Sequence, residues 1–351
     1  MLGPVRRIVP APLKRALRSK VNDVANRTDL SGRVEGLANQ VRNLESFRLD
    51  LIRQVQQLQD AVNHIQGWVN EFQPEVYRPA GDVRRQLDEL LTAHGVDASR
   101  FEPAVSKNDV MFQFLVQYYA REPGAVGRAF LTYTRSGLHM MQVLEAIVRR
   151  KFGSFDRVDG LLDFASGYAR LTRFLALAMD PARIWVSDIK PGAVEFSQRH
   201  FGVPGFVSTE APEDLSVERR FDLVFVASLF SHLPEETFGR WLQRMCDLLS
   251  PSGLLVFSVP HSDQIGTKPP SGISFRPVNE EGMTLTVDHR LDPNGYGTTH
   301  CTEGFVQRAI RALNFENKNY VRYGYALWFT QDVYLLSRDP ADDLTGMTLP
   351  T

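Results

Sequence analysis

The sequence predicts an α/β fold in which a long coiled-coil helix precedes a mostly parallel sheet. Two observations carry this prediction. Residues 34–72 repeat apolar side chains with a seven-residue period, and after Gly153 apolar strand-like runs alternate with helical ones. The first pattern is typical of a coiled coil, and the second is typical of a parallel sheet with crossover helices.

The composition is that of a soluble globular protein, with 43% hydrophobic and 23% charged residues in a chain of 351. A formal net charge of −1 argues against a chain that binds nucleic acid along its whole length. The two cysteines, Cys246 and Cys301, form neither a disulfide framework nor a zinc spacing. No run reaches the roughly 18–20 apolar residues of a membrane span, and no secretory signal is recognisable. We therefore expect a cytoplasmic protein.

The first segment, residues 1–29, is basic and amphipathic. Its cations within residues 1–22 are Arg6, Arg7, Lys14, Arg15, Arg18 and Lys20, without any acidic residue. Apolar residues recur among them at Leu13, Leu17, Val21 and Val24. Such a segment can lie on an anionic membrane surface, so we expect peripheral membrane contact. A solvated charged face and a contact with an acidic protein are the alternatives.

The coiled-coil segment is residues 30–73. One heptad column reads Val34, Val41, Arg48, Val55, Val62, Val69, and the other reads Leu37, Leu44, Leu51, Leu58, Ile65, Phe72. β-Branched residues in the first column with leucine in the second favour a parallel two-stranded coiled coil. We expect a homodimer through this segment. The alternative is one long helix that packs on its own domain.

Residues 74–152 form a linker and a helical lead-in. The linker is "FQPEVYRPAG" at 72–81, and helical patterns follow at 82–95, 109–120 and 125–152. The main domain is predicted at 153–340, followed by a tail at 341–351. Its strand-like runs are "VDGLLDFA", "RIWVSDI", "GFVST", "FDLVFVAS", "GLLVFSVP", "YVRYGYALWF" and "DVYLLSRD". Helices fit at 170–180, 191–201 and 235–249. The last two runs are too close for a crossover helix, so they predict an antiparallel terminal hairpin and seven strands in all.

An insertion between Pro260 and Thr302 is rich in Pro, Gly, Asp and Asn. Within it "GISFRPV" and "MTLTVDHRL" are predicted as short strands. An insertion at the carboxyl edge of a parallel sheet often covers a ligand crevice, although a surface decoration is the alternative.

The turn after the first of these strands reads Ala165-x-Gly167-x-Ala169. A dinucleotide-binding turn, G-x-G-x-x-G, would need its third glycine where Arg170 stands, so we do not expect NAD. The spacing instead suits a tight turn beneath a ligand without phosphates. Asp188 ends the next strand, 21 residues after Gly167, where an acid can accept hydrogen bonds from both hydroxyls of a ribose.

Five segments together resemble the class I S-adenosylmethionine-dependent methyltransferases over roughly residues 130–338. They are "LLDFASGYAR", "VSDIK", "STEAPEDL", "FDLVFVASLFSHLP" and "LLSPSGLLVFSVP". The resemblance implies a Rossmann-like, mostly parallel seven-stranded sheet with an antiparallel terminal hairpin. It also implies S-adenosyl-L-methionine as the cofactor.

The resemblance also implies a role for each matching residue. Asp163, Ala165 and Gly167 would flank the methionine portion of the cofactor. Asp188 and Ile189 would contact its ribose and adenine, Thr209 and Glu210 would lie at the adenine edge, and Ala227 and Ser228 would lie near the methyl group.

The acceptor side offers histidines as candidate bases. The turn "ASLFSHL" differs from the D/N-P-P-Y of amino methyltransferases of nucleic acids, and no cysteine motif suits a cytosine-ring mechanism. We expect no metal site. His232 and His261 follow the fourth and fifth strands and are the candidate catalytic bases. His232 could equally cap or pack the next helix.

Further candidates lie in or beside the insertion. His289 and His300 are additional candidate bases there, and Tyr296, Thr298 and Thr299 could bind a polar acceptor or form a plain turn. These residues favour an O-methyltransferase that acts on a sugar, a glycan or another hydroxylated small molecule. The alternative is a coiled-coil scaffold or membrane-tethered interaction protein with a non-catalytic methyltransferase-like domain.

Overall fold

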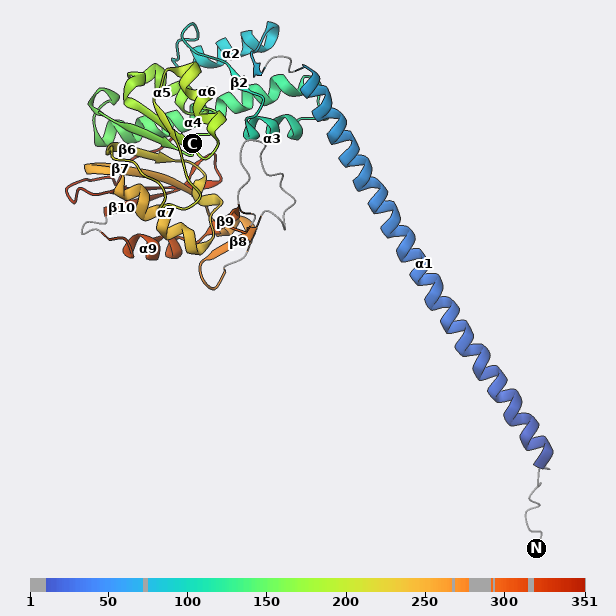
Figure 1. The fold of residues 1–351 in the computed structure, drawn as a ribbon. Coiled ribbons are helices and arrows are strands. Elements are labelled where there is room, and N and C mark those ends of the chain that lie inside the picture. Colours follow the sequence, from blue (N-terminus) through green and yellow to red (C-terminus); the bar gives the residue numbers. More distant parts are fainter. Residues whose placement is uncertain are drawn as a thin grey trace. The chain divides into compact units, whose positions relative to one another are not determined.

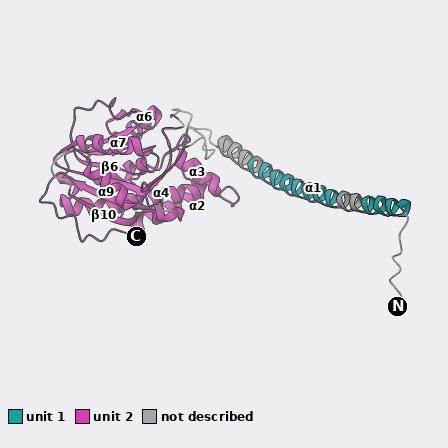
Figure 2. Ribbon diagram, turned by 90° about the horizontal axis from the view of Figure 1, so that it is seen from below, with its two compact units in different colours: residues 1–67 teal, residues 68–351 magenta. Residues whose placement is uncertain are grey.

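The computed structural model describes residues 11–71, 75–266, 269–277, 292, 294–314 and 319–350. The chain forms two compact units, residues 1–67 and residues 68–351 (Figure 2).

The first unit is dominated by one continuous helix, α1 (Ala11–Glu71). Because no proline falls between Pro12 and Pro74, nothing in the sequence interrupts its hydrogen-bond ladder. The long helix predicted from the heptads is therefore present, and it extends back to Ala11 within the basic segment, whose residues 1–10 lie outside the described residues. Its heptad side chains are 50–67% exposed: Val34, Leu37, Val41, Leu44, Leu51, Val55 and Leu58. The second strand of the coiled coil stays a prediction.

The second unit is built on a seven-stranded sheet of order β10-β11-β7-β6-β3-β4-β5 (Figure 1). The strands are β3 (Leu161–Phe164), β4 (Ile184–Asp188), β5 (Gly205–Val207), β6 (Phe221–Val226), β7 (Leu249–Pro260), β10 (Asn319–Leu327) and β11 (Gln331–Ser337). The pairs within β5-β4-β3-β6-β7 are parallel, whereas β11 runs antiparallel to both β7 and β10. The predicted Rossmann-like sheet with its terminal hairpin is confirmed.

Helices cover both faces of this sheet (Figure 1). α4 (Ala125–Lys151), α5 (Thr172–Ala178) and α6 (Pro191–Phe201) pack on one face, and α7 (Glu235–Asp247) and α9 (Glu303–Arg311) pack on the other. Successive strand residues feed opposite faces, since Leu161 packs into the first core cluster and Leu162 into the second. Short 3-10 turns are η1 (Phe155–Arg157), η2 (Pro181–Arg183), η3 (Leu229–Ser231) and η4 (Ser262–Ile265).

The lead-in packs against the main domain. It contains β1 (Val76–Tyr77), α2 (Gly81–Ala93), β2 (Val105–Ser106) and α3 (Val110–Tyr118), and β1 pairs with β2 antiparallel. Leu87 of α2 and Phe112 of α3 lie in the same apolar cluster as α4. The tail at 341–351 also packs on the domain, because Leu344 and Leu349 are buried in the apolar cluster that contains α4.

The insertion forms a separate two-stranded antiparallel sheet, β8 (Ile273–Pro277) with β9 (Gly297–Cys301). The predicted strand at 272–278 is therefore present, while the one predicted at 283–291 lies outside the described residues. The strand that pairs with β8 is β9, which includes Thr298 and Thr299. This corrects the alternative of a plain turn at these two residues. Thr299 is fully buried, and its hydroxyl donates to the Leu233 carbonyl at 2.6 Å, so it holds the insertion to the domain.

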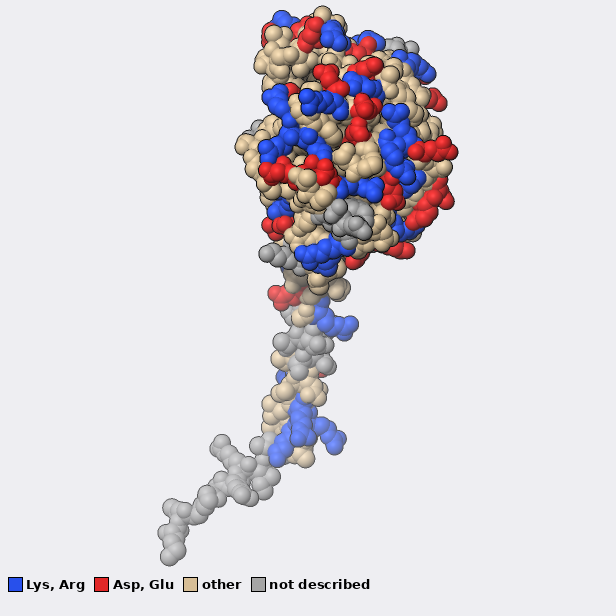
Figure 3. All heavy atoms as spheres, turned by 90° about the vertical axis from the view of Figure 1, so that its left-hand side faces the viewer, with Lys and Arg blue, Asp and Glu red and all other residues tan. Residues whose placement is uncertain are grey.

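Basic and acidic side chains are interspersed on the face of the second unit shown in Figure 3, in keeping with the small net charge. A search of the described helices found none with the length and apolarity needed to cross a bilayer.

Candidate functional site

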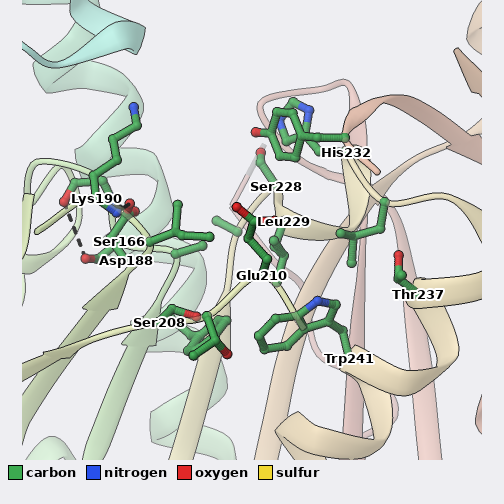
Figure 4. A pocket seen from close by; sticks show the side chains of 18 of the residues that line it. Ser166, Asp188, Lys190, Ser208, Glu210, Ser228, Leu229, His232, Thr237 and Trp241 are labelled. Carbon is green, nitrogen blue, oxygen red and sulfur yellow. Dashed lines mark hydrogen bonds between the residues drawn. The ribbon is translucent and has the colours of Figure 1, made fainter. Parts of the chain in front are cut away.

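A cavity of about 410 Å³ opens at the carboxyl edge of the parallel strands (Figure 4). Its lining includes the residues that follow β3, β4, β5 and β6. β3 and β6 are neighbours in the sheet, and the chain leaves them toward helices on opposite faces. This is the topological switch point, where open α/β sheets bind their ligands.

The turn after β3 takes its shape from three left-handed residues. Ala165, Gly167 and Ala169 have φ angles of 58°, 56° and 64°. A left-handed backbone conformation costs an alanine roughly 1–2 kcal/mol. Ala165 and Ala169 nevertheless adopt it, so the alternating small residues of the sequence do form a tight turn. A Cβ added to Gly167 would meet no atom within 4 Å, and Gly167 lines the cavity. Only at this central position does the missing side chain leave room for a ligand against the backbone.

Asp188 is fixed opposite that turn by two backbone donors. Its Oδ2 accepts from the N–H of Gly167 at 2.8 Å, and its Oδ1 accepts from the N–H of Lys190 at 3.0 Å. The side chain lies in the cavity wall and is 8% exposed, and burial raises the pKa of its carboxyl. Each carboxylate oxygen has a second lone pair, so the group can also accept hydroxyl donors from a ligand.

Asp163 lies behind the turn and is not among the cavity-lining residues. Its Oδ2 accepts from the Thr172 hydroxyl at 2.8 Å, and the side chain is 2% exposed. Burial raises the pKa of the Asp163 carboxyl to about 7. The contact with the methionine portion of a cofactor, predicted for Asp163, stays a prediction.

The other residues predicted to bind the cofactor all line the cavity: Ala165, Ile189, Thr209, Glu210, Ala227 and Ser228. Ser228 has a φ of 65°, and its hydroxyl accepts from the Gln331 amide at 2.9 Å. The Gln331 carbonyl oxygen in turn accepts from the Ser258 hydroxyl at 2.6 Å. This buried network ties the end of β6 to β7 and β11.

His232 stands in the cavity wall on the same side as Ser228 (Figure 4). Its Nδ1 is 2.8 Å from the Gly297 carbonyl, and its ring stacks on Tyr296 with centroids 4.7 Å apart. Because a carbonyl only accepts, Nδ1 carries the hydrogen, and Nε2 is the acceptor nitrogen of the neutral ring. Of the three insertion residues proposed as acceptor contacts, Tyr296 lines the cavity.

His261, the other candidate base, is not a lining residue of this cavity. Its Nδ1 lies 3.2 Å from both the N–H and a carboxylate oxygen of Asp263, so the ring caps η4. Its backbone bridges to Cys301 at the end of β9. Between the two predicted bases, the geometry favours His232.

Sequence reasoning missed Arg170, Asp109, Met111 and Trp241 as lining residues. The Arg170 guanidinium stacks over Trp328, 4.6 Å from the ring centroid, and is 3.5 Å from the Ser136 hydroxyl. None of the ion pairs found among the described residues includes Arg170, and burial lowers its pKa. A guanidinium in this setting suits a carboxylate ligand. The sequence shows that Arg170 directly follows the turn, but the direction of its side chain depends on the contact with Trp328.

Comparison with known proteins gives one family. The family described as "Methyltransferase domain" matches residues 161–253, which run from β3 into β7 and include the turn, Asp188 and His232. No curated protein matches the chain.

Three solved structures are similar to this chain at low sequence identity. A DhpI–SAM–HEP complex is 18% identical, with 67% of this chain and 100% of that chain covered and a TM-score of 0.40. The Burkholderia thailandensis 1,6-didemethyltoxoflavin-N1-methyltransferase is 18% identical, with 75% and 93% covered and a TM-score of 0.39. The plantazolicin methyltransferase BamL is 9% identical, with 64% and 94% covered and a TM-score of 0.41.

Proposed function

We propose that residues 161–253, which match the methyltransferase-domain family, belong to a class I S-adenosylmethionine-dependent enzyme that O-methylates a sugar, a glycan or another hydroxylated small molecule. The choice of oxygen as the atom that accepts the methyl group rests on His232. A histidine with Nε2 as its acceptor nitrogen stands in the wall of the same cavity as the cofactor-binding turn.

The cavity fits the cofactor, which supplies an electrophilic methyl group on a sulfonium centre. Gly167 leaves open space against the backbone, and Asp188 would accept hydrogen bonds from the ribose hydroxyls. Ile189, Thr209 and Glu210 would lie around the adenine. Arg170 would pair with the carboxylate of the methionine portion, which would give this half-buried cation an anionic partner.

The acceptor hydroxyl must lose its proton as it attacks a methyl group. Nε2 of His232 takes that proton, while the Gly297 carbonyl and the Tyr296 ring hold the imidazole in place. The surrounding wall of Leu229, Leu233 and Trp241 keeps water away from the reacting groups.

The test is a screen of hydroxylated and amine acceptors that measures release of S-adenosylhomocysteine by the full-length protein. We expect turnover with a hydroxylated acceptor and a kcat lower by about 10²–10⁴-fold in His232→Gln, with cofactor affinity unchanged. His94→Gln, which alters an exposed histidine near the end of α2, is the matched control. Turnover of amines alone, or full kcat in His232→Gln, would refute the proposal.

We also propose that α1 pairs in parallel with α1 of a second copy. The support is the run of half-exposed valines and leucines in two heptad columns, which an isolated helix leaves in water. Sedimentation of the full chain should give a dimer, and a chain lacking residues 1–75 should be monomeric and still bind cofactor. A monomeric full chain would contradict the pairing.

We further propose that the protein is cytoplasmic and that the basic start of α1 places it at an anionic membrane surface. Leu13, Leu17, Val21 and Val24 are 55–63% exposed there, with Lys14, Arg15, Arg18 and Lys20 among them. The full chain should co-sediment with anionic vesicles at low salt, and a chain lacking residues 1–22 should not. Equal pelleting of the two chains would exclude this contact.

A further inference from the structure

Helix α3 is apolar on both of its sides. Phe112 and Val116 are buried against α4, as the inner face of a surface helix should be. The outer side is also apolar, and its exposed fractions are 39% for Val110, 40% for Met111, 57% for Phe114 and 71% for Tyr118. A surface helix ordinarily carries polar residues on this side, so a contiguous apolar stripe indicates a binding surface.

The outer face is continuous with the cavity. Met111 belongs both to the exposed stripe and to the cavity lining. Asp109, at the N-cap of α3, also lines the cavity, and its carboxylate accepts from the N–H groups of Met111 and Phe112 at 2.9 and 3.1 Å. The start of the stripe is therefore fixed at the cavity itself.

A buried contact holds this helix start in position. The Tyr133 hydroxyl of α4 donates to the second Asp109 oxygen at 2.6 Å, and both side chains are at most 5% exposed. From Met111 the stripe continues through Phe114 to Tyr118, a rise of about 10 Å along the helix. The rings of Phe114 and Tyr118 lie side by side, with centroids 6.5 Å apart. The stripe of Met111, Phe114 and Tyr118 is thus a preformed apolar track that leads away from the cavity.

We propose that the outer face of α3 binds the apolar chain of an amphiphilic acceptor whose hydroxylated head enters the cavity. This inference rests on the proposed function and narrows its substrate class to hydroxylated molecules that carry an alkyl tail. The shared residue Met111 favours an acceptor as the occupant, because a tail on the stripe and a head in the cavity are then parts of one ligand.

The binding test uses methyl, hexyl and octyl β-D-glucoside below their micelle-forming concentrations. Affinity for the full chain, with S-adenosylhomocysteine present, is measured by saturation-transfer NMR. We expect about a twofold gain for each added methylene, because a chain on one helix face buries roughly half of its surface. In the double variant Phe114→Gln, Tyr118→Gln most of this gain should disappear, whereas Leu49→Gln, an exposed leucine of α1 outside the heptad columns, should retain it.

Affinity that does not depend on chain length, or an undiminished gain in the double variant, would overturn the inference. So would a double variant that loses binding to phosphatidylcholine vesicles or changes the sedimentation of the full chain, because the face would then be a membrane or self-association surface.

A parallel turnover assay separates this inference from the proposed function. Chain-length-dependent binding without methyl transfer to any hydroxylated acceptor would support the track and refute the proposed function. Methyl transfer at equal efficiency to short- and long-chain acceptors would support the function and refute the track.

Discussion

The two walls of the cavity are built in different ways. The wall formed by the ends of β3, β4 and β5 comes from one stretch of chain, and its shape is set by backbone angles and backbone donors. The opposite wall brings together the turn after β6 and Tyr296 of the insertion. A local wall suits a constant ligand such as the cofactor. A wall assembled from distant loops can change with the acceptor without disturbing the sheet.

The same contrast appears in how each wall holds its polar residue. Asp188 is fixed by the N–H groups of Gly167 and Lys190, which belong to the turns at the ends of β3 and β4. His232 is fixed by Gly297 and Tyr296, which arrive from another part of the sequence. We therefore expect changes in the first wall to affect cofactor affinity and changes in the second to affect turnover.

The largest effect on cofactor affinity is expected from Gly167→Val. A branched side chain in a left-handed turn is strained, and its Cβ would occupy the open space of the cavity, so cofactor affinity should fall on the order of a hundredfold. Gly202→Val is the matched control, since Gly202 is also left-handed with open space around its missing Cβ but does not line the cavity. Calorimetric titration of both variants checks the pair, and equal affinities would contradict the assignment of the first wall.

Asp188→Ala should weaken cofactor binding by roughly 1–3 kcal/mol, because charge-assisted hydrogen bonds to the ribose are lost. Asp222→Ala is the control: Asp222 likewise accepts two hydrogen bonds, from the Asp159 N–H and the Ser250 hydroxyl, but lies outside the cavity lining. If the two variants bind the cofactor with the same affinity, Asp188 does not hold the ribose.

Asp163 should make the stability of the cofactor-free protein depend on pH. Its folded pKa of about 7 lies above its ordinary value of 3.8, so between these values the folded state keeps a proton that the unfolded state has released. The free energy of unfolding should therefore fall as pH rises from about 4 to 7, by up to about 1.4 kcal/mol per pH unit. Denaturant unfolding of Asp163→Asn should show a flatter profile in this window. Superimposable profiles would show that the carboxyl titrates normally.

The smallest effect is expected from Tyr296→Leu in the second wall. Loss of the ring stacked on His232 should cost about 0.5–1.5 kcal/mol in orienting the imidazole, which lowers kcat by up to about tenfold. Cofactor affinity should be unchanged in the same titration. A weaker cofactor affinity with normal kcat would place Tyr296 in the first wall instead.

The first wall could be predicted from the sequence because its signals are local. The spacing of Ala165, Gly167 and Ala169 indicated a tight turn, and all three residues are left-handed. The terminal hairpin followed from the short gap between two apolar runs. Each of these features depends on residues that are neighbours in the chain.

The second wall, and the lining residues that depend on contacts between distant segments, could be predicted only in part. His232 was one of two candidate bases, and only its contact with Gly297 of β9 distinguishes it from His261. From the sequence, Arg170 indicates only that the third glycine of a dinucleotide turn is missing, whereas its stacking on Trp328 places it in the cavity wall. Met111 carried no signal, because an apolar residue in a helix is ordinarily part of the core.

We propose that the turn at Gly167 and the carboxylate of Asp188 form a site for S-adenosylmethionine. The direct test is isothermal titration of the full-length protein with S-adenosylmethionine, and separately with NAD. We expect one saturable site for S-adenosylmethionine with an affinity in the micromolar range, and no saturable binding of NAD, because Arg170 stands in place of the third glycine of a dinucleotide turn. Absence of S-adenosylmethionine binding, or NAD binding of equal strength, would contradict it.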